Sequence, residues 1–213
     1  MNSMLATAHA AVREAGRGLG YDEATVSAFL PARHEHVFEV AAGGRTYPAY
    51  RVQHNNRLGP FKGGIRFHPQ VSLDEVRALA LLMSIKTAAA GLEMGGGKGG
   101  VAVDPRVLPV AELEELSRAY ARQLAPFLGS DKDVPAPDVN TNGQIIGWML
   151  DEYEKTVGRK DPGCFTGKFL ADGGSEGRAA ATGRGGVIAL AEYLDQRGLL
   201  AQPLTVAVQG YGN

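Results

Sequence analysis

The chain of 213 residues carries 22 basic and 23 acidic side chains, and its net charge of −1 provides no strong field to attract nucleic acid or an anionic membrane. The single cysteine, Cys164, excludes an internal disulfide and leaves too few thiolates for a zinc or iron–sulfur site. No apolar stretch is long enough to span a bilayer, and no secretory signal pattern is present. We therefore expect a globular cytoplasmic protein that binds no metal.

The first half of the chain alternates between helical and extended patterns. In chain order, these patterns predict helices at 3–17 and 22–30, strands at 35–40 and 46–52, an extended segment at 62–69 and a helix from 72 to about 91. Gly43-Gly44 separates the two strands and predicts a hairpin. Ser72 followed by Glu75 is a capping-box pattern, which indicates where the third helix begins.

The second half continues this alternation. In chain order, we expect a buried strand at 101–103, a helix through 112–124, an extended segment at 133–138, a helix from 141 or 142 to about 157, a loop at 173–177, a helix at 181–196 and a strand at 204–208. Prolines exclude a helix at 133–138, because each proline pushes its predecessor into an extended conformation. The strand at 204–208 is apolar and β-branched, which is typical of parallel sheets.

Lys98 stands among five glycines in the run Gly95–Gly100. Glycine permits a close approach of the backbone, and a lysine held in a tight, desolvated site can act as a base because its pKa falls. A flexible surface loop with one solvated lysine is the alternative. A nucleotide-binding P-loop does not fit, because Gly99 stands where Ser or Thr should bind magnesium and Leu92 where the first glycine belongs.

Two further lysines and one carboxylate are candidates for the same site. Lys62 precedes Gly63-Gly64, and Lys86 lies beside the apolar stripe of its helix. Together with Lys98, these cations suit a small ligand with two or three negative charges. Asp138 follows a rigid Pro-x-Pro segment and is available for proton transfer. Lys86 can also be read as a cation that favours the helix carboxyl terminus, and Asp138 as a turn or capping residue.

Several motifs, in order and spacing, resemble the glutamate dehydrogenases of the Glu/Leu/Phe/Val dehydrogenase superfamily. The similarity covers about residues 20–213 and rests on the segments 50–56, 59–69, 95–100, 135–138, 166–168, 173–175, 181–185 and 208–213. The last segment follows the strand at 204–208 with Gly210-Tyr211-Gly212. A Gly-x-Gly after a strand resembles the opening of a dinucleotide-binding fold, although the third glycine and its helix are missing here.

The resemblance implies a role for each candidate residue. Lys98 matches the catalytic lysine that activates water at the imino carbon, and Asp138 matches the aspartate that moves a proton to and from the substrate nitrogen. Lys86 matches the lysine that binds the α-carboxylate, and Lys62 the one that binds the distal carboxylate. Met83 lies one turn before Lys86 at a position that lines the same pocket.

Four more residues match positions that contact the cofactor, which the resemblance implies to be NAD or NADP. Thr182 matches a threonine near the nicotinamide, and the start of the cofactor fingerprint is formed by Gly210, Gly212 and Asn213. The residue that discriminates NAD from NADP is expected about 20 residues beyond the fingerprint, so the choice stays open.

Lys62 also favours one substrate over others. Relatives that act on branched-chain or aromatic amino acids are apolar at this position, and burying an unpaired ammonium against an apolar side chain costs several kcal/mol. The resemblance therefore implies oxidative deamination of L-glutamate to 2-oxoglutarate and ammonia by a homo-oligomer, a hexamer in this family. The alternative is a catalytically incomplete fragment that acts only as a folding and oligomerisation module.

The fold implied by the resemblance is α/β. We expect a three-layer, mixed-sheet substrate-binding and dimerisation domain over residues 1–198. Residues 199–213 would then begin a truncated dinucleotide-binding (Rossmann) domain with its first strand. Exposed edges at 204–208 predict an aggregation-prone or partner-dependent chain.

Overall fold

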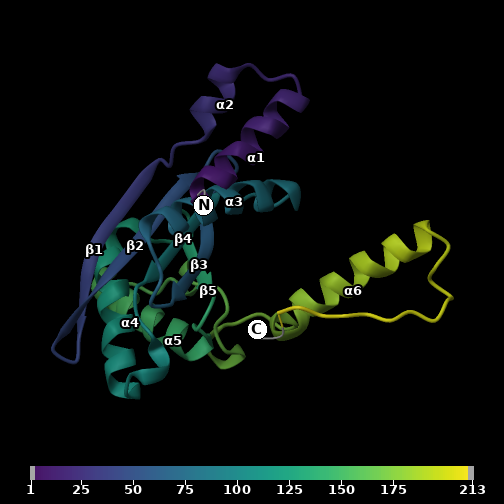
Figure 1. The fold of residues 1–213 in the computed structure, drawn as a ribbon. Helices are drawn as coiled ribbons and strands as arrows, with labels where there is room; N and C mark the ends of the chain where they lie inside the picture. The colour runs from purple at the N-terminus through teal and green to yellow at the C-terminus, as the bar shows by residue number, and fades with distance from the viewer. Residues whose placement is uncertain (1–2, 211–213) are drawn as a thin grey trace.

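The computed structural model describes residues 3–210, with the side chain of Ala179 left aside, and centres on a five-stranded mixed sheet (Figure 1). The strands, in the spatial order β1-β2-β4-β3-β5, are β1 (His34–Ala42), β2 (Arg45–Asn55), β4 (Gly96–Val101), β3 (Phe61–Phe67) and β5 (Asp133–Pro137). β1 and β2 form the predicted hairpin, and β2 is also antiparallel to β4. β3 runs parallel to both β4 and β5. The prediction of a mixed sheet is confirmed.

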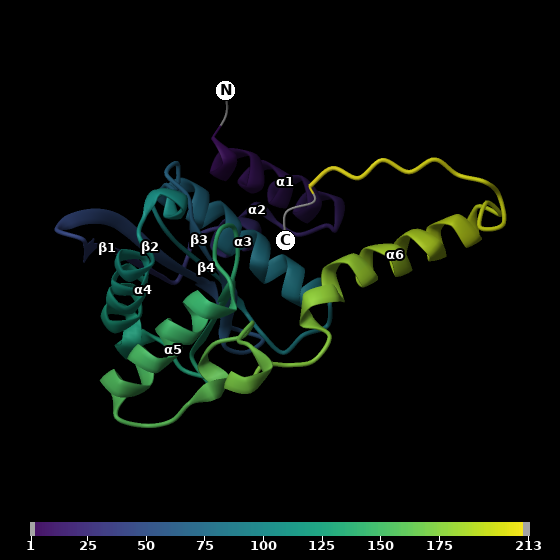
Figure 2. The same ribbon diagram turned by 90° about the horizontal axis from the view of Figure 1, so that it is seen from below.

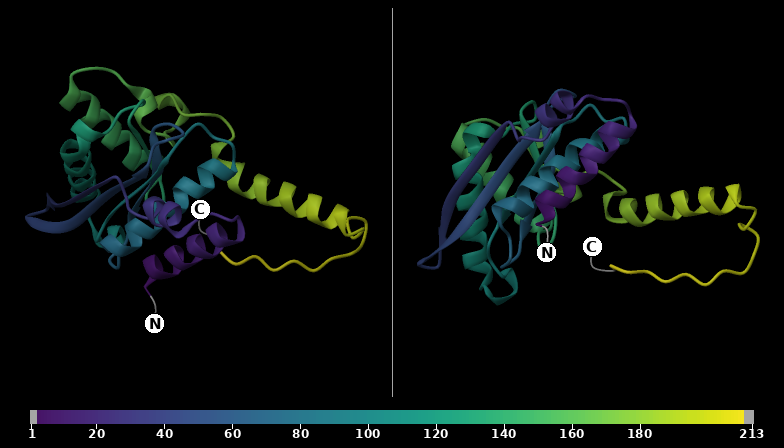
Figure 3. Two further views of the ribbon diagram at one scale, coloured as in Figure 1. Left: turned by 90° about the horizontal axis from the view of Figure 1, so that it is seen from above. Right: turned by 45° about the horizontal axis from the view of Figure 1, so that its top comes forward.

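Helices cover both faces of the sheet, so the predicted three layers are present (Figures 2 and 3). The helices are α1 (Met4–Gly18), α2 (Glu23–Phe29), α3 (Leu73–Ala89), α4 (Val110–Leu124), α5 (Gly143–Val157) and α6 (Arg178–Gln196). α3 packs on β2 and β4 with α1 outside it, while α4 and α5 pack together over the opposite face. Within residues 3–210, no helix is long and apolar enough to cross a membrane.

The larger core lies between the sheet and the α4–α5 layer. It joins Ile65 and Phe67 of β3 to Leu116 and Tyr120 of α4 and to Ile146 of α5, all of which are fully buried or nearly so. Burial of side chains of this size contributes about 1.5–3 kcal/mol each, which fixes the sheet against these two helices. This core gives the strands that carry the candidate site a rigid support.

The ends of the helices follow the predicted capping signals. The Ser72 hydroxyl accepts a hydrogen bond from the Glu75 backbone N–H at the start of α3. Asn142, one of the two predicted caps, accepts bonds from the backbone of Gln144 and Ile145 at the start of α5. Helix α5 ends at Gly158 in the left-handed conformation, as glycine at this position permits.

The glycine run forms the central strand β4, so the predicted strand at 101–103 is wrong in its bounds and the alternative of a flexible surface loop is also wrong. The reason is steric. A Cβ at Gly96 would overlap Ser84 of α3, and a Cβ at Gly99 would overlap the Tyr120 hydroxyl on the other face. Only glycine lets the two helical layers approach this strand so closely.

The predicted strand at 204–208 is not formed. Residues 203–210 run back as an extended chain beside α6, drawn in yellow in Figure 1, without helix or strand assignment. A strand exists only when its backbone groups bond to a partner strand, and the described residues offer none to this segment. Val206 and Val208 are 62% and 71% exposed as a result. The division at residue 198 into two domains stays a prediction.

Candidate functional site

Lys98 and Asp138 meet above a strand that lies between them. Lys98 is in the middle of β4, and Asp138 directly follows β5, on the other side of β3. The Lys98 Nζ lies 2.7 Å from the Asp138 Oδ2, and the Lys98 side chain is only 8% exposed. Gly64 of β3 leaves room for this contact, since a Cβ there would lie 2.6 Å from the Asp138 Cβ. The glycines of two strands thus allow a buried ion pair to form across a third.

The ion pair changes the pKa values of both groups. Burial disfavours the ammonium and lowers the pKa of Lys98, while the charge of Asp138 offsets part of this effect. Burial alone would raise the pKa of Asp138, but the charges of Lys98 and Arg66 outweigh it and lower that pKa. Lys98 is therefore easier to deprotonate than a surface lysine, as a base near neutral pH must be.

Lys62 is a second partly desolvated cation, on β3. Its Nζ donates to the Val134 carbonyl oxygen at 3.1 Å and to the Thr166 hydroxyl at 2.7 Å. Burial, together with the positive charge of Arg51, lowers the pKa of Lys62 to about 7, although Asp133 offsets part of the shift. Both direct partners are neutral, so an anion beside Lys62 would supply a counter-charge that its hydrogen bonds do not.

Arg51 of β2 and Asp133 of β5 form a buried ion pair that the sequence analysis did not predict. The Arg51 Nε donates to the Asp133 Oδ2 at 2.9 Å, its Nη2 also contacts Asp133, and both side chains are fully buried. Arg51 Nη1 donates to the Gly63 carbonyl oxygen at 3.1 Å, and Gln53 donates to Asp133 at 2.8 Å. The network fixes β2, β3 and β5 together. The sequence signal was a charged residue, Arg51, between Tyr50 and Val52 of a predicted strand.

Met83 and Lys86 occupy successive turns of α3. Met83 is partly buried beside β3, where a Cβ on Gly63 would lie 3.4 Å from its Cγ. Lys86 is exposed in the last turn, and its ammonium group makes no hydrogen bond or ion pair within residues 3–210. The structure thus brings Met83 next to β3, the strand of Lys62, and leaves the Lys86 side chain exposed to solvent.

The residues predicted to contact the cofactor are not assembled into a site. Thr182 is exposed on α6, and Gly210, with a φ of 86°, is exposed at the end of the extended chain. Gly212 and Asn213 lie outside the described residues. The described residues do not enclose a dinucleotide.

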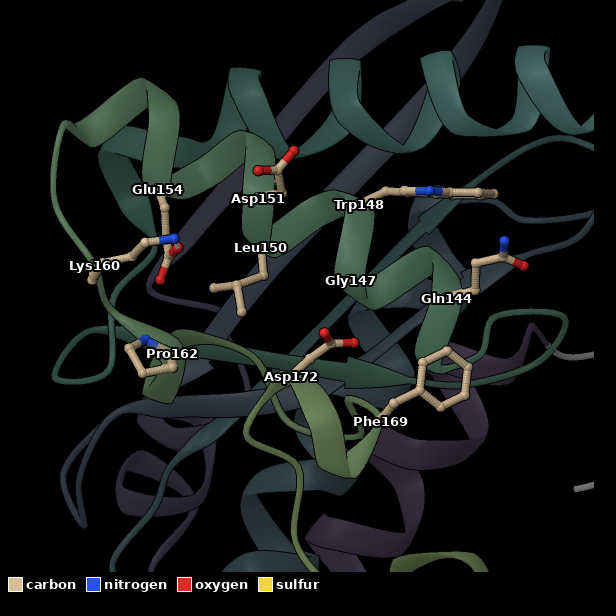
Figure 4. Close-up of a pocket in the computed structure, with 10 residues that line it drawn as sticks. All are labelled: Gln144, Gly147, Trp148, Leu150, Asp151, Glu154, Lys160, Pro162, Phe169 and Asp172. Carbon is tan, nitrogen blue, oxygen red and sulfur yellow. Dashed lines mark hydrogen bonds and ion pairs between the residues drawn. The ribbon is translucent and has the colours of Figure 1, made fainter.

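Another groove lies away from this site and has a different chemistry. It lies between α5 and the segment 160–172 and has a volume of about 570 Å³ (Figure 4). Asp151, Glu154 and Asp172 are among the residues that line it, with Trp148 and Phe169. Its three carboxylates outnumber its one cation, Lys160, so the groove is less suited to the anionic ligand that Lys62 and Lys98 favour. Within the described residues, no group of three or more His, Cys, Asp or Glu side chains could hold a metal ion.

Fold and site together define a three-layer α/β domain with a buried lysine–carboxylate pair on a glycine-rich sheet. Residues 34–155 match the family model described as the Glu/Leu/Phe/Val dehydrogenase, dimerisation domain. The chain belongs to this family, which confirms the resemblance found in the sequence.

Known proteins show how far the similarity extends. A NAD-specific glutamate dehydrogenase of Peptoniphilus asaccharolyticus is 51% identical over 170 residues, which cover 79% of this chain and 40% of that relative. The crystal structure of glutamate dehydrogenase from the same organism has a TM-score of 0.91 at 42% identity, covering 99% of this chain and 55% of that one. The hetero-hexameric glutamate dehydrogenase from Thermus thermophilus, in a leucine-bound form, has a TM-score of 0.78 at 39% identity, covering 80% of this chain and 42% of that one. The chain spans about half the length of the relatives it matches.

Proposed function

We propose that this chain supplies the substrate-binding and oligomerisation part of an NAD(P)-dependent glutamate dehydrogenase, an oxidoreductase of amino-acid metabolism. The reaction is oxidative deamination of L-glutamate to 2-oxoglutarate and ammonia. The observation that carries the proposal is the Lys98–Asp138 pair, which joins a buried lysine of lowered pKa to a carboxylate 2.7 Å away. General acid–base chemistry needs such a pair beside the reacting carbon.

In this proposal Lys98 is the base that activates the water attacking the imino carbon, and Asp138 moves a proton to and from the substrate nitrogen. The low exposure of Lys98 supports its role, because a base works best when its pKa lies near the working pH. The Asp138 carboxylate contacts the Lys98 ammonium, so both groups can reach the same substrate atoms.

Lys62 and Lys86 are proposed to bind the two carboxylates of glutamate, with Met83 lining the pocket between them. Lys62 would bind the distal carboxylate, because it is partly buried and its pKa of about 7 rises when an anion supplies a counter-charge. Lys86, which is exposed in the last turn of α3, would bind the α-carboxylate. An uncharged leucine or phenylalanine side chain would leave Lys62 buried without an anion.

The hydride acceptor in this proposal is NAD or NADP, and Thr182, Gly210, Gly212 and Asn213 would begin its binding site. The name of the Peptoniphilus asaccharolyticus relative favours NAD. When bound, the cofactor accepts the hydride from the substrate α-carbon, which requires the two to be held together.

A homo-oligomer, and in particular a hexamer, is the proposed assembly. The matched family model is named a dimerisation domain, and the Thermus thermophilus relative is described as hetero-hexameric. Light scattering on the purified chain tests this proposal. A mass of one protomer at micromolar concentration would contradict it.

A second proposal is that the 213-residue chain folds and assembles without turnover. The unpaired, exposed segment 203–210 favours it, because a hydride acceptor needs an enclosed site. Nucleotide-dependent oxidation of glutamate by the purified chain, freed of host enzyme, decides between the two. Activity that disappears in Lys98→Met supports the first proposal, and no activity despite specific binding of 2-oxoglutarate supports the second.

A further inference from the structure

Arg66 contacts the Lys98–Asp138 pair from β3 and has no role in the proposed reaction so far. Its Nε donates to the Asp138 Oδ2 at 3.1 Å, the same oxygen that Lys98 contacts at 2.7 Å. The Arg66 side chain is 23% exposed and Asp138 is 22% exposed, so water screens this contact only in part. One carboxylate oxygen of Asp138 therefore contacts two cationic side chains. Its Oδ1 has no hydrogen bond within residues 3–210.

Glu75, in the first turn of α3, holds the other end of the same guanidinium. The Arg66 Nη1 contacts the Glu75 Oε1, and Glu75 is also 23% exposed. The capping-box pattern predicts that the Glu75 carboxylate returns to the Ser72 backbone N–H. Only the opposite half of the box is present, in which the Ser72 hydroxyl accepts from the Glu75 N–H. The Glu75 carboxylate binds Arg66 instead.

These contacts form a chain of alternating charge that runs from Lys98 through Asp138 and Arg66 to Glu75. The planar guanidinium can bond two carboxylates at once in a fixed geometry, which an ammonium group does less well. We propose that Arg66 is a positioning residue that shares the Asp138 Oδ2 with Lys98 and so reduces the negative charge that Lys98 receives, and that Glu75 sets how much of the Arg66 charge the pair experiences. This inference rests on the proposed function for its catalytic meaning.

The two residues should act on Lys98 in opposite directions. The charge of Arg66 is one of the influences that lower the pKa of Lys98, and it also lowers the pKa of Asp138. Removing the Arg66 charge should therefore raise the pKa of Lys98. Removing the Glu75 charge leaves Arg66 without its second counter-charge and should lower the pKa of Lys98 further. The opposite signs distinguish charge tuning from a loss of packing, because admitting water would raise the pKa of Lys98 in both variants.

The test is an NMR titration of the ligand-free 213-residue chain with ¹³Cε-labelled lysine, in which Lys98→Met identifies the Lys98 signal. We expect the Lys98 midpoint to rise by about half a pH unit or more in Arg66→Gln and to fall by a similar amount in Glu75→Gln. Arg77→Gln is the matched control. Arg77 lies on α3 and pairs with Glu35 at 2.7 Å, away from the lysine–aspartate pair, so the Lys98 midpoint should not change.

Shifts of the same sign in Arg66→Gln and Glu75→Gln, or no shift in either, would overturn the inference. If circular dichroism shows that Arg66→Gln does not fold, the sign of the shift in Glu75→Gln decides alone. The titration needs no substrate, so its outcome is independent of the proposed function. Calorimetry of 2-oxoglutarate binding to the unaltered chain tests that function separately.

Discussion

Replacement of Lys62 by methionine should make the domain more stable while it removes a substrate contact. Burial lowers the pKa of Lys62 from 10.5 to about 7, so the folded chain holds an ammonium that the unfolded chain solvates better. The shift of about 3.5 units corresponds to about 5 kcal/mol at 1.4 kcal/mol per unit. The bonds to Val134 and Thr166 offset about 1.5 kcal/mol each, which leaves a net gain of about 2 kcal/mol in Lys62→Met.

The sign of the pH dependence follows from the same shift. Between pH 7 and 10.5 the unfolded chain holds the Lys62 proton and the folded chain does not, so stability rises with pH. The destabilising effect of Lys62 is complete below pH 7 and is relieved as the pH approaches 10.5. In Lys62→Met this contribution, about 1.4 kcal/mol per pH unit, should disappear.

Urea unfolding at pH 6.5 and pH 9, followed by the fluorescence of the single tryptophan, Trp148, measures both effects. We expect Lys62→Met to exceed the parent in stability by about 2 kcal/mol at pH 6.5 and to have lost this advantage at pH 9, because the parent gains about 1.4 kcal/mol per pH unit above pH 7. Lys132→Met is the control, because Lys132 is exposed, and it should match the parent at both pH values. A less stable Lys62→Met at pH 6.5, or an advantage that does not change with pH, would refute the reasoning.

Two further variants test the sheet and the ion pair. Gly63→Ala should cost about 3 kcal/mol in urea unfolding, because its Cβ would overlap the Gly97 carbonyl oxygen. Gly183→Ala, in an open part of α6, should be neutral or slightly stabilising, and equal losses in the two would contradict the steric argument. Asp138→Asn should lower the pKa of Lys98 further, because the carboxylate that raises it is removed; an NMR titration with an unchanged or higher Lys98 midpoint would count against the pair.

Local signals predicted most of the fold. The hairpin of β1 and β2, the cap at Ser72 and the cap at Asn142 each depend on residues within four positions of one another. The glycine strand could not be predicted in this way, since glycine has low strand propensity and offers no alternation of side chains. Its conformation is set by helices that approach from both faces, which is a property of the tertiary structure.

The candidate site was predicted as a set of residues and not as a set of contacts. The motifs indicated Lys62, Lys98 and Asp138, but the partners of these residues lie far away in the chain. Thr166 is 104 residues from Lys62, and Arg51 is 82 residues from Asp133. Nothing in the local pattern joins such pairs, because strand order and register bring them together.

The most direct test of the proposed function is a calorimetric titration of the chain with 2-oxoglutarate and with 4-methyl-2-oxopentanoate, which lacks the distal carboxylate. A charge-assisted contact with Lys62 contributes about 1.5–3 kcal/mol, so 2-oxoglutarate should bind at least about 10-fold more tightly. The preference should disappear in Lys62→Leu and persist in Lys132→Leu. Equal affinity for the two acids, or a preference that survives in Lys62→Leu, would contradict the assignment of a glutamate site.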